Sequence, residues 1–189
     1  MEIRKRAALF DLDGLLCDFV AGSLAVHSAH LPMAEVTWDF PAQIGFEKGA
    51  ADPAFWSPLS NAGFWEGLKP LEDGMAVFRA VAAQLPKDRI GFLSSGIVPG
   101  ASDGKRAWIA RHLPGWEKHL ILGTHKALLA APCKVLVDDY GPNVEGFRAA
   151  GGRAVLVPRP WNSRRVMTCD QGRFDSGRIA DEVLAELLS

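Results

Sequence analysis

The chain has 189 residues, of which 48% are hydrophobic and 23% charged, and its formal net charge is −1. This length suits one domain with room for an inserted subdomain, and the composition excludes a disordered, collagen-like or coiled-coil protein. The near-zero net charge excludes a global basic field of the kind that draws a protein onto nucleic acid or an anionic membrane. An anion-binding site must therefore be local.

The start of the chain and its cysteines bear on its location. No apolar run approaches the roughly 18 residues that span a bilayer, and MEIRKRAALFDLDG meets acidic residues before a signal-peptide core forms. Cys17, Cys133 and Cys169 are far apart, which fits neither a disulfide framework nor a CxxC zinc site. We expect a cytoplasmic protein with reduced thiols, no membrane partner and no stable nucleic-acid partner.

The first predicted element is a strand at residues 7–10, which are apolar at successive positions, as in strands buried on both faces. Residues 18–69 break with this pattern, because they are rich in tryptophan, phenylalanine and proline and contain no strand-like run. We predict that residues 18–69 form a small, mainly helical cap, inserted after the first strand. Residues 1–17 and 70–189 then form the core.

From residue 70 onward, helical patterns alternate with short apolar runs. Helices are predicted at 75–85, 105–112, 126–130, 143–150 and 179–187, with Thr124 and Asn143 as the N-caps of the third and fourth. Strands are predicted between them at 90–93, 120–122, 135–137 and 154–157. This alternation predicts an α/β fold with a doubly wound parallel sheet.

Polar side chains follow four of the predicted strands. They are Asp11 and Asp13 after the first, Ser94 and Ser95 after the second, Lys126 after the third, and Asp138 and Asp139 after the fourth. Ligands bind outside the carboxyl ends of parallel strands, so we expect these side chains to share one site. Carboxylates suit Mg²⁺, whereas Ser and Lys side chains bind phosphate oxygens. The pattern predicts a site for a phosphate and a divalent cation.

The DLDG sequence supports catalysis at this site. Asp11 and Asp13 are two residues apart and can face the same side, while Gly14 permits a sharp turn. One carboxylate of such a pair can attack phosphorus while the other protonates the leaving oxygen and then activates water. The attack brings two anions together, which costs roughly 4 kcal/mol at about 4 Å and an effective dielectric of about 20. A metal ion and Lys126 would offset this repulsion.

DLDGLLCDF, Ser94, Lys126 and the Asp138–Asp139 pair resemble the four signature motifs of the haloacid dehalogenase superfamily, in the same order. The resemblance implies a Rossmann-like core, an aspartyl-phosphate on Asp11, acid/base catalysis by Asp13, and phosphate binding by Ser94 and Lys126. It also implies that Mg²⁺ binds Asp11, Asp138 and the backbone carbonyl of Asp13, with help from Asp139. Members that cleave carbon–halogen bonds lack the second aspartate, and P-type ATPases replace it, so Asp13 favours a phosphatase or phosphomutase.

Within the superfamily, the chain is similar to nucleotidases of the 5'(3')-deoxyribonucleotidase type. The similarity lies in the insertion after DLDGLLCDF and in GFWEGLKPLEDGM, WIARHLPGWEKHLILGTHK and VPRPWN. It implies hydrolysis of nucleoside or deoxynucleoside monophosphates, with Phe19 near the base and the backbone around Ser95 contacting phosphate. Trp38, Phe40 and Trp65 are further candidates for the base site. We expect most rings of the cap to pack a hydrophobic core and one or two to stack on a base.

Two other functions stay open. The first is a phosphatase for a sugar phosphate or a nucleic-acid phosphate end, which a polar cleft or a basic groove would favour. The second is a non-catalytic module that binds a phosphometabolite. Two closely spaced carboxylates argue against the second function, because phosphate binding alone has no use for them.

The segment GASDGKR at residues 100–106 invites comparison with a P-loop. One residue is missing before the Gly-Lys pair, and Arg106 stands where a Ser or Thr would hold magnesium. We therefore expect Lys105 and Arg106 to be solvated in the first turn of a helix, where they lend positive potential to the site.

Overall fold

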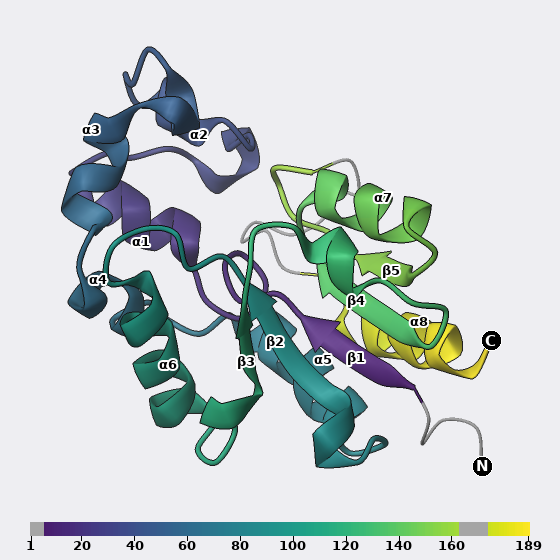
Figure 1. The fold of residues 1–189 in the computed structure, drawn as a ribbon. Coiled ribbons are helices and arrows are strands. Elements are labelled where there is room, and N and C mark those ends of the chain that lie inside the picture. The colour runs from purple at the N-terminus through teal and green to yellow at the C-terminus, as the bar shows by residue number, and fades with distance from the viewer. Residues whose placement is uncertain (1–5, 163–173) are drawn as a thin grey trace.

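The computed structural model describes residues 6–162 and 174–189, which form an α/β fold around a five-stranded parallel sheet (Figure 1). The strands are Ala7–Phe10 (β1), Ile90–Ser94 (β2), Leu120–Leu122 (β3), Lys134–Asp138 (β4) and Arg153–Leu156 (β5). The sheet order is β3-β2-β1-β4-β5. The chain thus winds outward from β1 to β3 and then crosses back to β4, which places the switch point between β1 and β4. The predicted doubly wound sheet and its strands are confirmed.

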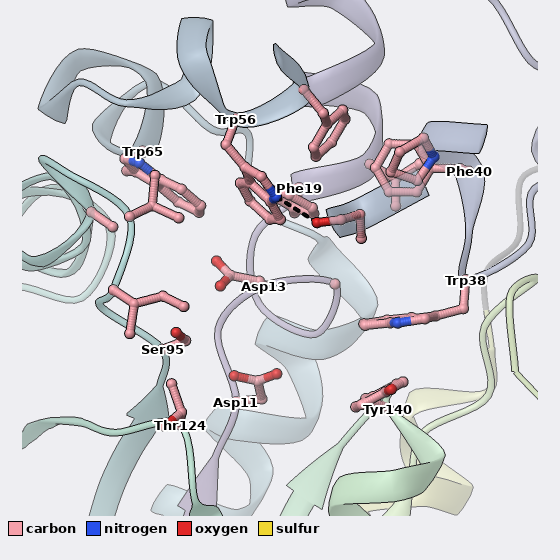
Figure 2. Close-up of a pocket in the computed structure, with 18 of the residues that line it drawn as sticks. Asp11, Asp13, Phe19, Trp38, Phe40, Trp56, Trp65, Ser95, Thr124 and Tyr140 are labelled. Carbon is pink, nitrogen blue, oxygen red and sulfur yellow. Dashed lines mark hydrogen bonds between the residues drawn. The ribbon is translucent and has the colours of Figure 1, made fainter. Parts of the chain in front are cut away.

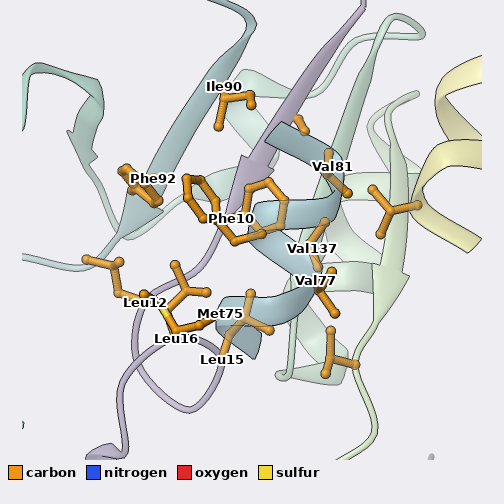
Figure 3. Packing of buried hydrophobic residues seen from close by; sticks show 14 of the residues in the cluster. Phe10, Leu12, Leu15, Leu16, Met75, Val77, Val81, Ile90, Phe92 and Val137 are labelled. Atoms are coloured by element: carbon orange, nitrogen blue, oxygen red, sulfur yellow. The ribbon is translucent and has the colours of Figure 1, made fainter. Parts of the chain in front are cut away.

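Helices cover both faces of the sheet, which explains why β1, β2 and β4 consist mainly of buried apolar residues. Phe10 and Val137 are neighbours in the sheet and pack in a large cluster with helices Glu72–Ala82 (α5) and Ser176–Leu188 (α8) (Figure 3). Leu9 and Leu136 are also neighbours and pack in a second cluster with helix Gly141–Ala149 (α7). Burial on both faces fixes the strand register, because a shift by one residue exchanges the two sets.

The remaining core helices follow the predicted order, but the two predicted helix N-cap residues, Thr124 and Asn143, are wrong. Helix Ala101–His112 (α6) connects β2 to β3, and the 3-10 helix Lys126–Leu129 (η7) precedes β4. His125, rather than Thr124, precedes η7, and no side chain caps it. Helix α7 begins at Gly141, so Asn143 lies inside it and its side chain donates to Asp138 Oδ2 at 3.0 Å. A buried carboxylate is the better hydrogen-bond acceptor for this amide.

The segment between β1 and α5, residues 18–69, is referred to below as the cap. Its helices are Phe19–Val26 (α1), Met33–Glu35 (η2), Phe40–Gln43 (α2), Gly49–Ala51 (η3), Pro53–Trp56 (α3), Ser57–Leu59 (η4) and Ala62–Glu66 (α4). The cap lies beyond the carboxyl ends of the strands (Figure 1), and it buries a cluster of its own around Phe40 and Phe55. Cys17 and Pro70 form an antiparallel bridge where the chain enters and leaves it. The assignment of residues 18–69 as a separate subdomain stays a prediction.

No described helix is both long and apolar enough to cross a membrane. Cys17 is buried and Cys133 exposed, and both are free thiols. Cys169 lies outside the described residues.

Candidate active site

The loop after β1 brings Asp11 and Asp13 to the carboxyl edge of the sheet. Gly14, at the turn of this loop, has a φ of +79°, a conformation that glycine adopts without strain. A Cβ at Gly14 would lie 2.4 Å from Oδ2 of Asp139, which follows β4. Only glycine therefore lets the loop approach Asp139 so closely.

Lys126 connects the ends of β1 and β4. Its Nζ lies 2.8 Å from Asp11 Oδ1 and 2.7 Å from Asp138 Oδ2, and all three side chains are buried. Burial lowers the pKa of Lys126, but the charges of Asp11 and Asp138 outweigh it, so the net effect raises this pKa above its ordinary value. The lysine is therefore a fixed positive charge beneath the site.

One lysine does not balance the carboxylates around it. Burial, together with the charges of Asp138 and Asp13, raises the pKa of Asp11 to about 7, despite the opposing effect of Lys126. Burial also raises the pKa of Asp139 well above its ordinary value, with further contributions from Asp138 and Asp11. These shifts mean that the site resists carrying all of its negative charge without another cation.

Asp11, Asp138 and Asp139 fit a metal site. Each offers one carboxylate oxygen, and these oxygens lie within 4.8 Å of one another. Asp139 Oδ2 accepts a hydrogen bond from Trp161 Nε1 at 2.6 Å, whereas its Oδ1 is buried without a partner among the described residues. An unpartnered buried carboxylate oxygen is costly unless a cation binds it. The three oxygens suit a hard divalent cation, while the Asp13 side chain lies outside this cluster.

Lys105 belongs to the site, and the prediction that it is solvated is wrong. Its side chain is buried, and its Nζ lies 2.5 Å from Asp13 Oδ2 and 2.9 Å from Ser94 Oγ. Helix α6 packs against the cap helix α4, and Lys105 is buried near its start. The next residue, Arg106, is exposed. Ser94 Oγ also lies 3.3 Å from Asp13 Oδ2, and Ser95 lines the cavity described next. The roles of Ser94 and Ser95 in phosphate binding stay predictions.

A cavity of about 730 Å³ separates the sheet from the cap (Figure 2). Among the described residues that line it, the charged ones all lie at the sheet end: Asp11, Asp13, Lys105, Lys126 and Asp139. Together with the buried Asp138, they are called the carboxylate floor. The opposite end is uncharged and aromatic in the described part of the lining, so the cavity offers an ionic and an apolar end to one ligand.

The four ring residues predicted for the base site, Phe19, Trp38, Phe40 and Trp65, all line the cavity. Together with Trp56 they are called the aromatic wall. Phe19 stacks between Trp65 and Trp56, with ring centroids 5.6 Å and 6.0 Å apart. Trp38 is 44% exposed and stacks on Tyr140 of the core at 4.0 Å, whereas Phe40 and Trp65 are buried. The structure brings these rings together, and base binding by any of them stays a prediction.

Sequence reasoning missed several residues around the site. Trp56, Tyr140 and Trp161 line the cavity, and the buried Arg159 donates to the Gly14 carbonyl at 2.7 Å and forms an ion pair with Asp73. Arg159 thereby supports the loop that carries Asp11 and Asp13. Arg159 and Trp161 follow β5 and belong to the VPRPWN segment that carries the family resemblance, but the sequence pattern assigned neither residue a role.

A comparison with solved structures agrees with the fold described above. Among solved structures, the chain is similar to a HAD family hydrolase from Deinococcus radiodurans R1 that was crystallised with bound phosphate and sodium. The TM-score is 0.50, with 17% sequence identity over 82% of this chain and 80% of that chain. None of the curated proteins matches the chain significantly.

The fold is that of a HAD family hydrolase, and the family match makes the chain a phosphatase. The model of the family described as "5' nucleotidase, deoxy (Pyrimidine), cytosolic type C protein" matches residues 5–184. The chain belongs to this family, as the resemblance of its motifs implied.

Proposed function

We propose that this protein is a Mg²⁺-dependent phosphomonoesterase that hydrolyses nucleoside or deoxynucleoside monophosphates through a phosphorylated Asp11. One observation carries the proposal: a single cavity has the carboxylate floor at one end and the aromatic wall at the other. The family description, with its reference to deoxy and pyrimidine 5'-nucleotidases, supports the same substrate class. Its word "cytosolic" supports the expected cytoplasmic location.

Asp11 and Asp13 carry the chemistry in this proposal. A carboxylate oxygen of Asp11 attacks phosphorus, and the bond from phosphorus to the ester oxygen breaks as Asp13 gives its proton to that oxygen. The alcohol leaves, and Asp13, now a carboxylate, takes a proton from a water molecule that attacks the phosphorus of the aspartyl-phosphate. Inorganic phosphate leaves, and Asp11 is again a carboxylate while Asp13 holds the proton. The side-chain position of Asp13, outside the buried carboxylate cluster and lining the cavity, suits this role.

Lys126 and the end of β2 hold the phosphate. Lys126 Nζ lies 2.8 Å from the attacking group Asp11, and Ser95 lines the cavity beside it. In this proposal Mg²⁺ is held by Asp11, Asp138 and Asp139 with the backbone carbonyl of Asp13, and it supplies the positive charge that lets an anionic nucleophile meet an anionic phosphate. The buried Asp139 Oδ1 without a partner supports this assignment.

The shape and charge of the cavity favour a nucleoside monophosphate over a sugar phosphate or a nucleic-acid end. Lys105 and Lys126 are the cationic side chains among the described lining residues, and both are already paired with carboxylates. The described lining therefore offers no cluster of free cations for a diphosphate or a polynucleotide backbone. The uncharged aromatic wall matches the flat face of a base better than the hydroxyl groups of a sugar.

A panel of phosphate monoesters, assayed for phosphate release with and without Mg²⁺, tests the proposal. The panel contains deoxynucleoside, nucleoside and sugar monophosphates and a short oligonucleotide with a terminal phosphate. We expect the monophosphates of nucleosides to be cleaved best, and Asp11→Asn to lose activity by about 10³-fold or more because the nucleophile is gone. Equal rates for Asp11→Asn and wild type would overturn the mechanism. Tight nucleotide binding without phosphate release would favour the non-catalytic alternative.

A further inference from the structure

Lys105 makes a set of contacts that the proposed mechanism does not use. Its Nζ lies 2.5 Å from Asp13 Oδ2, 2.9 Å from Ser94 Oγ and 2.6 Å from the Ser95 carbonyl oxygen. It also lies 4.6 Å from the centroid of the Trp65 ring, within range of a cation–π contact. One buried ammonium group thus touches the second aspartate, the end of β2 and the aromatic wall.

These contacts distinguish Lys105 from Lys126. An ammonium group has three N–H donors, and Lys105 has three oxygen partners within hydrogen-bond distance, so no donor is left for a substrate phosphate. On Asp13 it occupies Oδ2, which Ser94 Oγ also contacts. Asp13 Oδ1 makes a long contact, 3.6 Å from the Cys17 thiol. Lys105 therefore fixes one oxygen of Asp13 and leaves Oδ1 for the cavity.

The position of Lys105 is itself fixed by close helix packing. Helix α6 begins after Gly100, which has a φ of +78°, and a Cβ at Gly100 would lie 2.5 Å from the backbone N of Ala62 in the cap helix α4. A Cβ at Gly104 would lie 2.4 Å from the carbonyl oxygen of Ala62. Two glycines in one turn thus bring α6 against α4 at backbone distance, and Lys105 extends from this contact to Asp13.

We propose that Lys105 is a positioning residue for Asp13: it holds Oδ2 so that Oδ1 carries the proton to the leaving oxygen. This inference rests on the proposed function. In the first step the proton moves from Asp13 to the ester oxygen as the bond from Asp11 to phosphorus forms and the ester bond breaks. The carboxylate that remains on Asp13 keeps its ion pair with Lys105. Removing the ammonium group therefore harms the proton transfer rather than the binding of phosphate.

The dependence on the leaving group separates this role from a merely structural one. A deoxynucleoside monophosphate releases an alkoxide-like oxygen that needs a proton, whereas p-nitrophenyl phosphate releases a stable anion that does not. The value of kcat/KM reports the steps up to formation of the phosphoenzyme, so it isolates the first proton transfer. For Lys105→Met we expect kcat/KM to fall by about 10²-fold with the nucleotide and by less than about 5-fold with p-nitrophenyl phosphate, the size of a general-acid contribution.

Three further variants complete the experiment. Asp13→Asn should show the same selective loss, and Lys126→Met should lower kcat/KM for both substrates because it removes a phosphate contact. Arg106→Met, next to Lys105 but exposed, should match wild type. If Lys105→Met does not fold, Lys105→Gln, which keeps two N–H donors without the charge, is assayed for the same ratio.

The outcomes separate this inference from the proposed function. If wild type cleaves no phosphate monoester, the proposed function fails and this inference falls with it. If wild type is active but the Lys105 variant loses both substrates equally, or neither, the proposed function stands and the positioning role is wrong. A selective loss on the nucleotide supports both.

Discussion

The carboxylate floor and the aromatic wall face each other across one cavity but are held together in different ways. On the floor, Lys126 is 2.8 Å from Asp11 and 2.7 Å from Asp138, and Lys105 is 2.5 Å from Asp13. In the wall, rings contact rings, and Trp38, which is 44% exposed, stacks on Tyr140 of the core. Removing one partner of a buried charge pair leaves the other charge uncompensated, whereas losing one ring pair costs about 0.5–1.5 kcal/mol beyond the buried area. We expect substitutions on the floor to remove activity and substitutions in the wall to tune substrate affinity.

The largest expected effect comes from removing the fixed charge of the floor. Lys126→Met leaves Asp11 and Asp138 buried without their shared cation, which we expect to cost about 3–5 kcal/mol of stability. We also expect kcat/KM to fall by about 10³-fold, because the proposed mechanism loses a phosphate contact and the charge beside its nucleophile together. Urea unfolding and phosphate release measure the two effects.

The matched control is Lys118→Met, since Lys118 is exposed and is not among the residues that line the cavity. It should change stability and rate by less than the scatter of the assay. A Lys126→Met protein that keeps its activity within tenfold of wild type would show that the floor tolerates the loss of its central cation.

Gly14 and Gly45 test the comparison between the floor and the cap. Both adopt a left-handed conformation, but only Gly14 lies against a residue of the floor. Gly14 has a φ of +79° and a Cβ there would meet Asp139 Oδ2 at 2.4 Å; Gly45 of the cap has a φ of +100° and open space. We expect Gly14→Ala and Gly45→Ala each to cost about 1–2 kcal/mol of stability from backbone strain. Only Gly14→Ala should also lower kcat, by about 10²-fold, because it displaces Asp139. Equal rates for the two variants would show that the contact with Asp139 does not matter for catalysis.

The floor should also make the metal-free protein sensitive to pH. The pKa of Asp11 rises from 3.8 to about 7 on folding, mainly through burial, so the folded state binds a proton that the unfolded state releases. The stability from this group is full below about pH 4 and is lost as the pH rises through about 7. Between pH 5 and 8 in chelator, we expect Tm to fall on the order of 5–10 °C, at about 1.4 kcal/mol per pKa unit and about 2–4 °C per kcal/mol.

Two measurements check the origin of this fall. Asp11→Asn cannot titrate, so its Tm should fall less over the same range. Adding Mg²⁺ at pH 8 should restore Tm in wild type, because a cation offsets the charge that opposes ionisation. An identical pH profile for Asp11→Asn would place the effect elsewhere.

Sequence alone predicts the floor, apart from Lys105, because its other members lie at or after the ends of strands. The buried strands are short continuous apolar runs, and the polar residues that follow them, such as Asp11, Lys126 and Asp138, converge once the sheet is parallel. No long-range information is needed beyond the strand order. The sequence also identifies the aromatic residues of the wall. Which of their ring faces line the cavity depends on how the short cap helices pack.

The missed residues depend on contacts between distant segments. Lys105 looks like a solvated lysine at the start of a helix until α6 packs against α4 and carries it to Asp13. Asn143 looks like a helix cap until the carboxylate of Asp138 is placed beside it. In both cases a contact with a carboxylate from another segment decides where the side chain lies. The pattern of residues within one segment does not reveal such a contact.

The smallest expected effect tests the wall. Trp38 is the most exposed of its rings, so Trp38→Ala should cost little stability and leave kcat unchanged. If Trp38 stacks on the base, KM for a nucleoside monophosphate should rise by about 10-fold, within the roughly 1–3 kcal/mol that a ring contributes per base. Inhibition by inorganic phosphate, which has no base, should be unaffected and serves as the internal control. Weaker inhibition by phosphate would instead mean that the Trp38–Tyr140 stack supports the floor, and the separation between floor and wall would fail.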